Sequence, residues 1–170
     1  AFVWLASPLL LGAILSAAVC HELGHWLVLR RVGGRIQRLH ITVFGAEMQV
    51  DDRRISYGGE LLAAAAGPVS NLLLAAAIGL LGRWWEPLYL FAGAQLVLGA
   101  FNLLPALPLD GGRILWLALA WLTEPYTAQR VLSAVSLAVS LALLLGGGGL
   151  IWRLGGSPFL LVGAVGLTGW

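Results

Sequence analysis

The stretch LLLGAILSAAVCHELGHWLVL, residues 9–29, decides the fold class because an apolar run contains three ionisable side chains near its end. A helix that spans a bilayer needs roughly 20 consecutive apolar residues, and this run has that length. Ionisable groups inside such a helix are costly, so they usually mark a functional or a tightly paired site. The stretch therefore predicts a membrane helix with a functional site in its second half.

The three ionisable residues belong to the pattern His21-Glu22-Leu23-Gly24-His25. On a helix, positions i and i+4 lie about 40° apart around the axis and about 6 Å along it, so His21 and His25 can bind one metal ion together. Two neutral imidazoles suit zinc, and the carboxylate of Glu22 can take a proton from a water that the metal activates. The pentad alone has another interpretation, in which local hydrogen bonds satisfy both histidines.

The composition of the whole chain is typical of a membrane protein. Of its 170 residues, 59% are hydrophobic and only 11% are charged, whereas soluble domains carry about 25% charged residues. The net charge of +2 is small, and no basic patch is interleaved with aromatic residues, so we expect no nucleic acid as a partner. The lone Cys20 cannot form an intrachain disulfide and is expected to pack between helices.

Five apolar segments indicate helices that cross or enter the bilayer. They are residues 9–29, 60–81, 87–104, 112–122 and 127–145. The fourth segment is short for a complete span. A glycine run at 146–149 is expected to end the fifth helix, and residues 150–170 form a sixth apolar segment that begins with a loop. We therefore predict an all-α polytopic membrane protein with about five to six transmembrane helices.

The segment from Arg35 to Tyr57, between the first two spans, has a different pattern. The β-branched and aromatic residues at 41–44 precede Gly45, which predicts a small β-hairpin. Arginines are concentrated in and beside this segment, at positions 30, 31, 35, 38, 53 and 54. Under the positive-inside rule, this bias predicts that the hairpin and the nearby pentad lie toward the cytoplasm.

A third candidate ligand lies far along the chain, in the run NLLPALPLDGG at residues 102–112. Two prolines and two glycines break the helix here, and irregular backbone at membrane depth is tolerated where it lines a protein cavity. The break can direct the carboxylate of Asp110 at a metal. Two histidines and one aspartate leave a fourth tetrahedral position open, as a catalytic zinc site requires. Asp110 could also cap the helix that follows it, and both roles could coexist.

With these motifs, the chain resembles the site-2 protease family of intramembrane zinc metalloproteases, and particularly its compact sporulation-type members. The resemblance rests on HELGH at 21–25, GPVSN at 67–71 and NLLPALPLDGG at 102–112, in this order along the chain. Three ordered motifs are much more specific than the pentad alone.

The resemblance implies a set of roles for the site. His21, His25 and Asp110 would bind one Zn²⁺ per chain, and Glu22 would be the catalytic acid and base. The substrate would be a transmembrane protein that is hydrolysed in or near its membrane segment after local unwinding, as in regulated intramembrane proteolysis. An exposed strand edge of the hairpin could hold the unwound substrate, or the hairpin could simply cover the site.

Four further polar residues have open interpretations. Asn71 and Asn102 either orient the substrate or stabilise the developing oxyanion, or they form hydrogen bonds between helices. Glu60 and Arg113 lie at helix starts, where we expect an end cap or an interfacial partner rather than a catalytic role.

The sequence also predicts domain organisation and location. We expect a single membrane-embedded metalloprotease domain over residues 1–170, truncated at its N-terminus and without the PDZ or CBS domains of many relatives. It would be a multi-pass protein of the lipid bilayer, in a prokaryotic cell membrane, with a membrane regulatory protein as a further candidate partner. The alternative function is a metal-binding or metal-transport protein without proteolysis, which leaves no evident use for Glu22.

Overall fold

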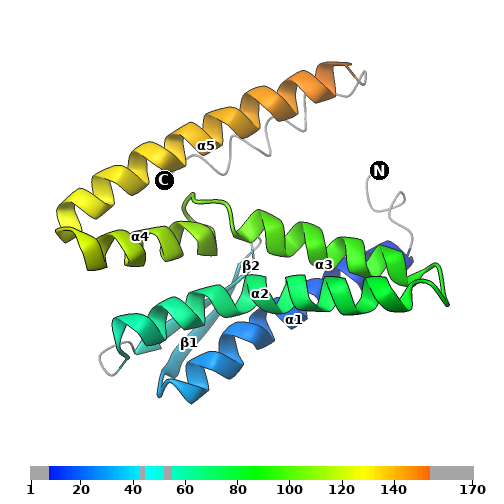
Figure 1. Cartoon of the computed structure of the whole chain (residues 1–170), viewed down its shortest axis with the longest axis horizontal. Coiled ribbons are helices and arrows are strands. Elements are labelled where there is room, and N and C mark those ends of the chain that lie inside the picture. Colours follow the sequence, from blue (N-terminus) through cyan, green and yellow to red (C-terminus); the bar gives the residue numbers. More distant parts are fainter. Residues whose placement is uncertain (1–7, 43–44, 52–54, 154–170) are drawn as a thin grey trace.

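The described part of the chain is a helical protein with one small sheet (Figure 1). The structure is a computed structural model, and it describes residues 8–42, 45–51 and 55–153. Its elements are α1 (Pro8–Arg31), β1 (Arg35–Thr42), β2 (Gly45–Asp51), α2 (Tyr57–Leu81), α3 (Leu88–Asn102), α4 (Asp110–Leu122) and α5 (Pro125–Arg153).

Helices α1, α2 and α3 pack against one another and form the core that carries the pentad. Helix α4 packs against α2, and α5 packs against α4 (Figure 1). Small side chains fill the interfaces between the first three helices, as is usual where membrane helices approach closely. The buried alanines of these helices are Ala13, Ala17, Ala64, Ala75 and Ala92.

Two glycines set the spacing of these three helices. A Cβ atom on Gly24 of α1 would lie only 2.6 Å from Oγ of Ser70 on α2. A Cβ atom on Gly99 of α3 would lie 2.9 Å from Cβ of Asn71, also on α2. Contacts this short do not occur between real side chains, so the helices can reach this spacing only with glycine at both positions.

Strands β1 and β2 form an antiparallel two-stranded sheet between α1 and α2 in the chain. The register pairs Arg35 with Asp51 at one end and Thr42 with Gly45 at the other, with an irregularity between Ile36 and Arg38. Residues 43–44, which the sequence analysis includes in the hairpin, lie outside the described residues.

Fewer helices are suited to cross a membrane than the sequence predicts. Within the described residues, α1, α2 and α5 are long and apolar enough to do so. Helix α3 has 15 residues and α4 has 13, short of the roughly 20 that a span needs. The predicted count of five to six spans is therefore not supported. The irregular stretch 103–109 separates two short helices, and residues 154–170 of the sixth segment lie outside the described residues.

The predicted helix break at the glycine run 146–149 is wrong. Helix α5 continues through these glycines as far as Arg153, the last residue that the structure describes. Glycine weakens a helix in water by about 1 kcal/mol relative to alanine. In an apolar medium, however, unpaired backbone groups cost several kcal/mol each, so the helical conformation remains favoured.

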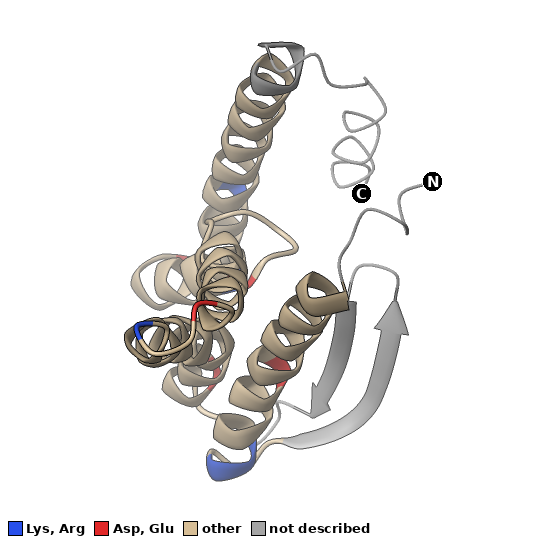
Figure 2. Cartoon of the chain, turned by 90° about the vertical axis from the view of Figure 1, so that its right-hand side faces the viewer, with Lys and Arg blue, Asp and Glu red and all other residues tan. Residues whose placement is uncertain are grey.

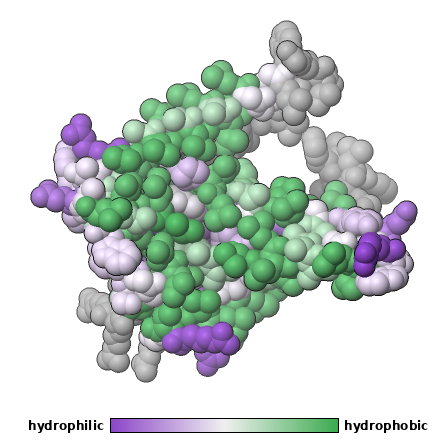
Figure 3. Space-filling view, in the orientation of Figure 1, coloured by the Kyte–Doolittle hydropathy of each residue, from purple (hydrophilic) through white to green (hydrophobic). Residues whose placement is uncertain are grey.

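The surface of the helices is mostly apolar, with charge near their ends. Large apolar side chains are exposed along every described helix and dominate the face in Figure 3. Basic residues cluster in the last turn of α1, at Arg30 and Arg31, as the blue end of that helix shows (Figure 2). Beyond α2, the side chain of Trp84 is 74% exposed beneath the guanidinium of Arg83, which lies 5.3 Å from its ring centroid. This pattern fits helices surrounded by lipid, with interfacial aromatic residues at a boundary.

Candidate metal centre

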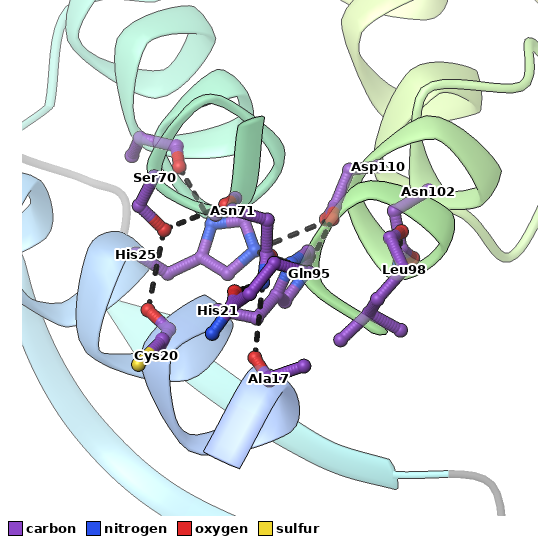
Figure 4. A network of polar contacts seen from close by, with 12 residues as sticks. Ala17, Cys20, His21, His25, Ser70, Asn71, Gln95, Leu98, Asn102 and Asp110 are labelled. Carbon is purple, nitrogen blue, oxygen red and sulfur yellow. Dashed lines mark hydrogen bonds and ion pairs between the residues drawn. The ribbon is translucent and has the colours of Figure 1, made fainter. Parts of the chain in front are cut away.

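The structure brings the pentad of α1 together with the first residue of α4. His21 Nε2 lies 2.9 Å from Oδ2 of Asp110, and His25 Nε2 lies 3.3 Å from the same oxygen (Figure 4). The two Nε2 atoms are 3.1 Å apart. Three potential metal ligands from two helices thus converge on one point.

The spacing of these three atoms fits a metal ion. Ligand atoms about 2.0–2.1 Å from a tetrahedral zinc ion are separated from one another by about 3.3 Å. The observed separations are 2.9, 3.1 and 3.3 Å, close to that value. Two imidazole nitrogens and one carboxylate oxygen are also a donor set that zinc accepts, with a fourth position left for water or substrate.

The tautomers of both histidines follow from their second ring nitrogens. Nδ1 of His25 lies 2.7 Å from the backbone oxygen of Ala63, and Nδ1 of His21 lies 2.6 Å from Oδ1 of Asn71. Both partners are oxygens that only accept hydrogen bonds, so each Nδ1 carries the proton. When the rings are neutral, both Nε2 atoms therefore present lone pairs.

This arrangement points three lone pairs at one another. Two Nε2 atoms and a carboxylate oxygen within 3.3 Å repel each other unless protons or a cation lie among them. A divalent cation satisfies all three atoms at once. Hydrogen bonds from Nδ1 to protein oxygens are also the usual way in which proteins orient histidines that bind a metal.

Helix α2 provides the space and the acceptors for the two rings. A Cβ atom on Gly67 would overlap the imidazole of His25, so glycine at this position makes room for the ring. Ser70 Oγ lies 2.7 Å from the backbone oxygen of Gly67 and 3.2 Å from that of Cys20, so its hydroxyl proton is shared between α2 and the turn before His21. The GPVSN motif therefore fits closely against the pentad.

Asp110 is placed by the irregular stretch before α4. The N-cap of α4 is Leu109, which makes no side-chain cap bond, and Asp110 directs its carboxylate at the histidines. A capping role for Asp110 is therefore not supported. A Cβ atom on Gly112 would lie 2.7 Å from the backbone oxygen of Ala106, so the glycines after Asp110 allow the stretch to fold back on α4.

Glu22 lies beside the three ligands on α1. Its side chain is half-buried and within electrostatic reach of His25, His21 and Asp110. The carboxylate is therefore near the point at which the ligands converge, without being one of the three.

The two asparagines differ in their surroundings. Asn71 is fully buried and uses its amide group within the protein: Oδ1 accepts from His21, and Nδ2 donates to the backbone oxygen of Ala17 and to Oε1 of Gln95. Asn102, at the end of α3, donates to the backbone oxygen of Leu98 in its own helix. Among the described contacts, only Asn71 thus belongs to the hydrogen-bonded group around the histidines.

Sequence reasoning did not single out two of these partners. Gln95 is a buried polar side chain in an otherwise apolar segment, and that contrast was a signal available in the sequence. The backbone oxygen of Ala63 has no signal, since any residue would supply it. The expected interfacial partner of Arg113 is Glu60, at 2.7 Å between Nη2 and Oε1.

The chain is similar to known metalloproteases. Residues 80–146 match peptidase family M50. The chain is 29% identical over 138 residues to the zinc metalloprotease MJ0392 of Methanocaldococcus jannaschii, which covers 77% of this chain and 40% of that protein. It is 29% identical over 155 residues to stage IV sporulation protein FB of Bacillus subtilis, which covers 84% of this chain and 54% of that protein. Its fold is similar to a solved site-2 protease from Methanocaldococcus jannaschii, with a TM-score of 0.71 and 26% identity, covering 92% of this chain and 73% of that one.

The fold and the site define a helical protein with apolar helices and a candidate metal centre of two histidines and one aspartate. The comparisons confirm the resemblance that the three motifs predict, and the chain is related to the site-2 proteases of peptidase family M50. The chain spans only about half of the length of these two relatives, 40% and 54%.

Proposed function

We propose that this chain carries the catalytic centre of an intramembrane zinc metalloprotease, which hydrolyses peptide bonds in or near transmembrane segments of membrane proteins. The observation that carries the proposal is the convergence of three lone pairs from His21, His25 and Asp110, with Glu22 beside them on an apolar helix. Two similar proteins, a zinc metalloprotease and a site-2 protease, support zinc binding and proteolysis.

The side chains of the site suggest a separate role for each residue in hydrolysis. His21, His25 and Asp110 would hold one zinc ion per chain. When bound, zinc supplies Lewis acidity, which lowers the pKa of a water and polarises the carbonyl of the substrate. Glu22 takes the proton of the attacking water and later delivers a proton to the leaving amine. Asn71 keeps His21 in the orientation and tautomer that the metal requires.

The lipid-facing surface supports a membrane protein as the substrate. Helices α1, α2 and α5 expose large apolar side chains over most of their length, so a substrate helix in the same bilayer could approach the centre laterally. We retain the proposals that the hairpin end of α1 faces the cytoplasm of a prokaryotic cell and that a membrane protein regulates access. Arg30 and Arg31 at that end of α1 support the orientation.

Metal binding without proteolysis has less support. A transport site needs exchangeable ligands and a path, but it has no use for a carboxylate beside the ligands that can act as a base. Glu22 therefore separates the two functions, because its role is needed only for hydrolysis.

The test is the substitution Glu22→Gln, which removes the base and preserves the size of the side chain. We expect unchanged zinc content and a loss of cleavage of single-span membrane substrates by about 10²–10⁴-fold, the usual contribution of a general base. Zinc is measured by elemental analysis of purified protein, and cleavage is measured in vesicles. Equal cleavage by the variant and the wild type would contradict the proposed function.

A further inference from the structure

Gln95 is a buried polar side chain on α3 that the proposed reaction does not use directly. Its side chain is 1% exposed, and its neighbours in the middle of α3 are apolar. Burying an amide in apolar surroundings costs free energy unless its polar atoms are hydrogen-bonded. The contacts of Gln95 therefore indicate why a polar residue is present here.

Gln95 ends a chain of hydrogen bonds that reaches the metal centre across three helices. Its Oε1 accepts from Nδ2 of Asn71 on α2, and Oδ1 of Asn71 accepts from Nδ1 of His21 on α1 (Figure 4). All three side chains are buried. A change at Gln95 can thus reach His21 through one intervening residue.

The acceptors around Asn71 determine in which direction the hydrogen bonds of this series are donated. Its Nδ2 faces two oxygens, the backbone oxygen of Ala17 and Oε1 of Gln95. If the amide were reversed, its oxygen would face these two acceptors, and its N–H groups would face Nδ1 of His21. The proton of the neutral ring would then move to Nε2, the atom that faces the metal.

Gln95 adds a second acceptor to the one that the backbone of Ala17 provides for Asn71. In an α-helix, the oxygen of Ala17 already accepts the backbone N–H of His21, four residues later. Its bond to Asn71 is a second, shared interaction at 3.1 Å. Oε1 of Gln95 accepts the second amide hydrogen of Asn71.

We propose that Gln95 is a positioning residue that acts through Asn71 to keep the Nε2 lone pair of His21 directed at the metal. The proposal rests on the proposed function only in that the two histidines and Asp110 bind zinc. Among the hydrogen bonds of the described residues, Gln95 bonds to Asn71 and to none of the three proposed ligands, so its effect is on metal affinity.

The test compares zinc affinity in Gln95→Met, Asn71→Ala and the double variant, measured by competition with a chelator in purified detergent-solubilised protein. Methionine has nearly the same shape as glutamine and lacks a strong acceptor. We expect Gln95→Met to lower zinc affinity by about 10–100-fold, the usual effect of losing a residue that orients a ligand. In the Asn71→Ala background, Gln95→Met should have no further effect, since the connection is already broken.

Two controls separate positioning from packing. Gln129→Met makes the same chemical change at an exposed position of α5, and should leave zinc affinity unchanged. The visible spectrum of the Co²⁺-substituted protein should shift in Gln95→Met, which a loss of packing at a distance would not cause. If Gln95→Met does not fold, Gln95→Leu provides the same comparison.

The outcomes distinguish this inference from the proposed function. Wild-type zinc affinity and an unshifted Co²⁺ spectrum in folded Gln95→Met would overturn the role of Gln95 and leave the protease proposal intact. Equal, additive losses in both backgrounds would also overturn it, because Gln95 would then not act through Asn71. A wild-type protein that binds zinc without cleaving substrates would refute the protease proposal alone, and one that binds no zinc would refute both.

Discussion

At the candidate metal centre, each histidine uses Nδ1 for a hydrogen bond within the protein and leaves Nε2 for the proposed ion. Ala63 and Asn71 accept the two Nδ1 protons, which leaves both Nε2 atoms free to bind. The orientation of each ring is therefore set before any metal arrives. Binding then needs little rearrangement of the side chains, which favours high affinity.

The space for His25 gives a prediction at the scale of one residue. Gly67→Ala would place a methyl group within the imidazole ring, so the ring must move away from the other two ligands. We expect a destabilisation of about 1–3 kcal/mol, typical of an overpacked interior, together with a loss of bound zinc. Thermal unfolding and zinc content measure the two effects.

The control for Gly67→Ala is Gly58→Ala, in the first turn of the same helix, where an added Cβ atom meets nothing within 4 Å. That variant should keep its zinc and be at least as stable as the wild type, because alanine favours a helix over glycine. Full zinc content in Gly67→Ala would show that the ring has more room than its contacts indicate.

Pairs of helices, rather than single residues, bring the two halves of the site together. Arg113, one turn after Asp110 on α4, pairs with Glu60 on α2 at 2.7 Å. Glu60 lies one turn before Ala63, whose oxygen orients His25. The ion pair thus connects the start of α4, which carries Asp110, to α2, whose backbone orients His25.

Exchanging the two charges tests whether this ion pair holds α4 against α2. The pair is partly exposed, and such pairs contribute about 0.2–1 kcal/mol. Glu60→Arg and Arg113→Glu alone should each reduce stability and zinc affinity modestly, because they place like charges together. The double exchange should recover most of both losses. Losses in the double variant that equal the sum of the single ones would mean that the two residues act independently.

The candidate ligands could be predicted from the sequence, but the residues that hydrogen-bond to them could not. His21, His25 and Asp110 stand out because ionisable groups are rare in apolar segments and their types match metal ligands. The partners of their second nitrogens depend on how α2 and α3 pack, which the order of residues does not reveal. The predicted segment 87–104 is slightly longer than α3, whereas α4 starts two residues before the predicted segment 112–122, because the helix resumes at Asp110 rather than after the glycines.

The whole molecule has charged and aromatic residues at the ends of apolar helices, which predicts its orientation in the bilayer. Arg31 is the last residue of α1, and Trp84 follows the end of α2. The chain crosses the bilayer once between them, through α2, so we expect the two residues on opposite sides. In a Cys20→Ala background, we expect a cysteine at position 31 to react with impermeant reagents from the cytoplasmic side only. A cysteine at position 84 should react from the other side only.

Labelling of intact cells and of inverted vesicles measures this directly, and a cysteine at the exposed Gly58, near the start of α2, provides the matched control on the side of position 31. Labelling of position 31 from outside the cell would reverse the proposed topology without affecting the metal centre.

The separation of the ligands along the chain also bears on how the protein is made. Asp110 follows His21 by 89 positions, so α1, α2 and α3 are synthesised before the third ligand exists. A growing chain that has inserted only these helices holds two imidazoles and no carboxylate partner. If the finished protein cuts membrane segments, its nascent form is harmless to proteins inserting beside it until the ribosome has passed the second half of the site.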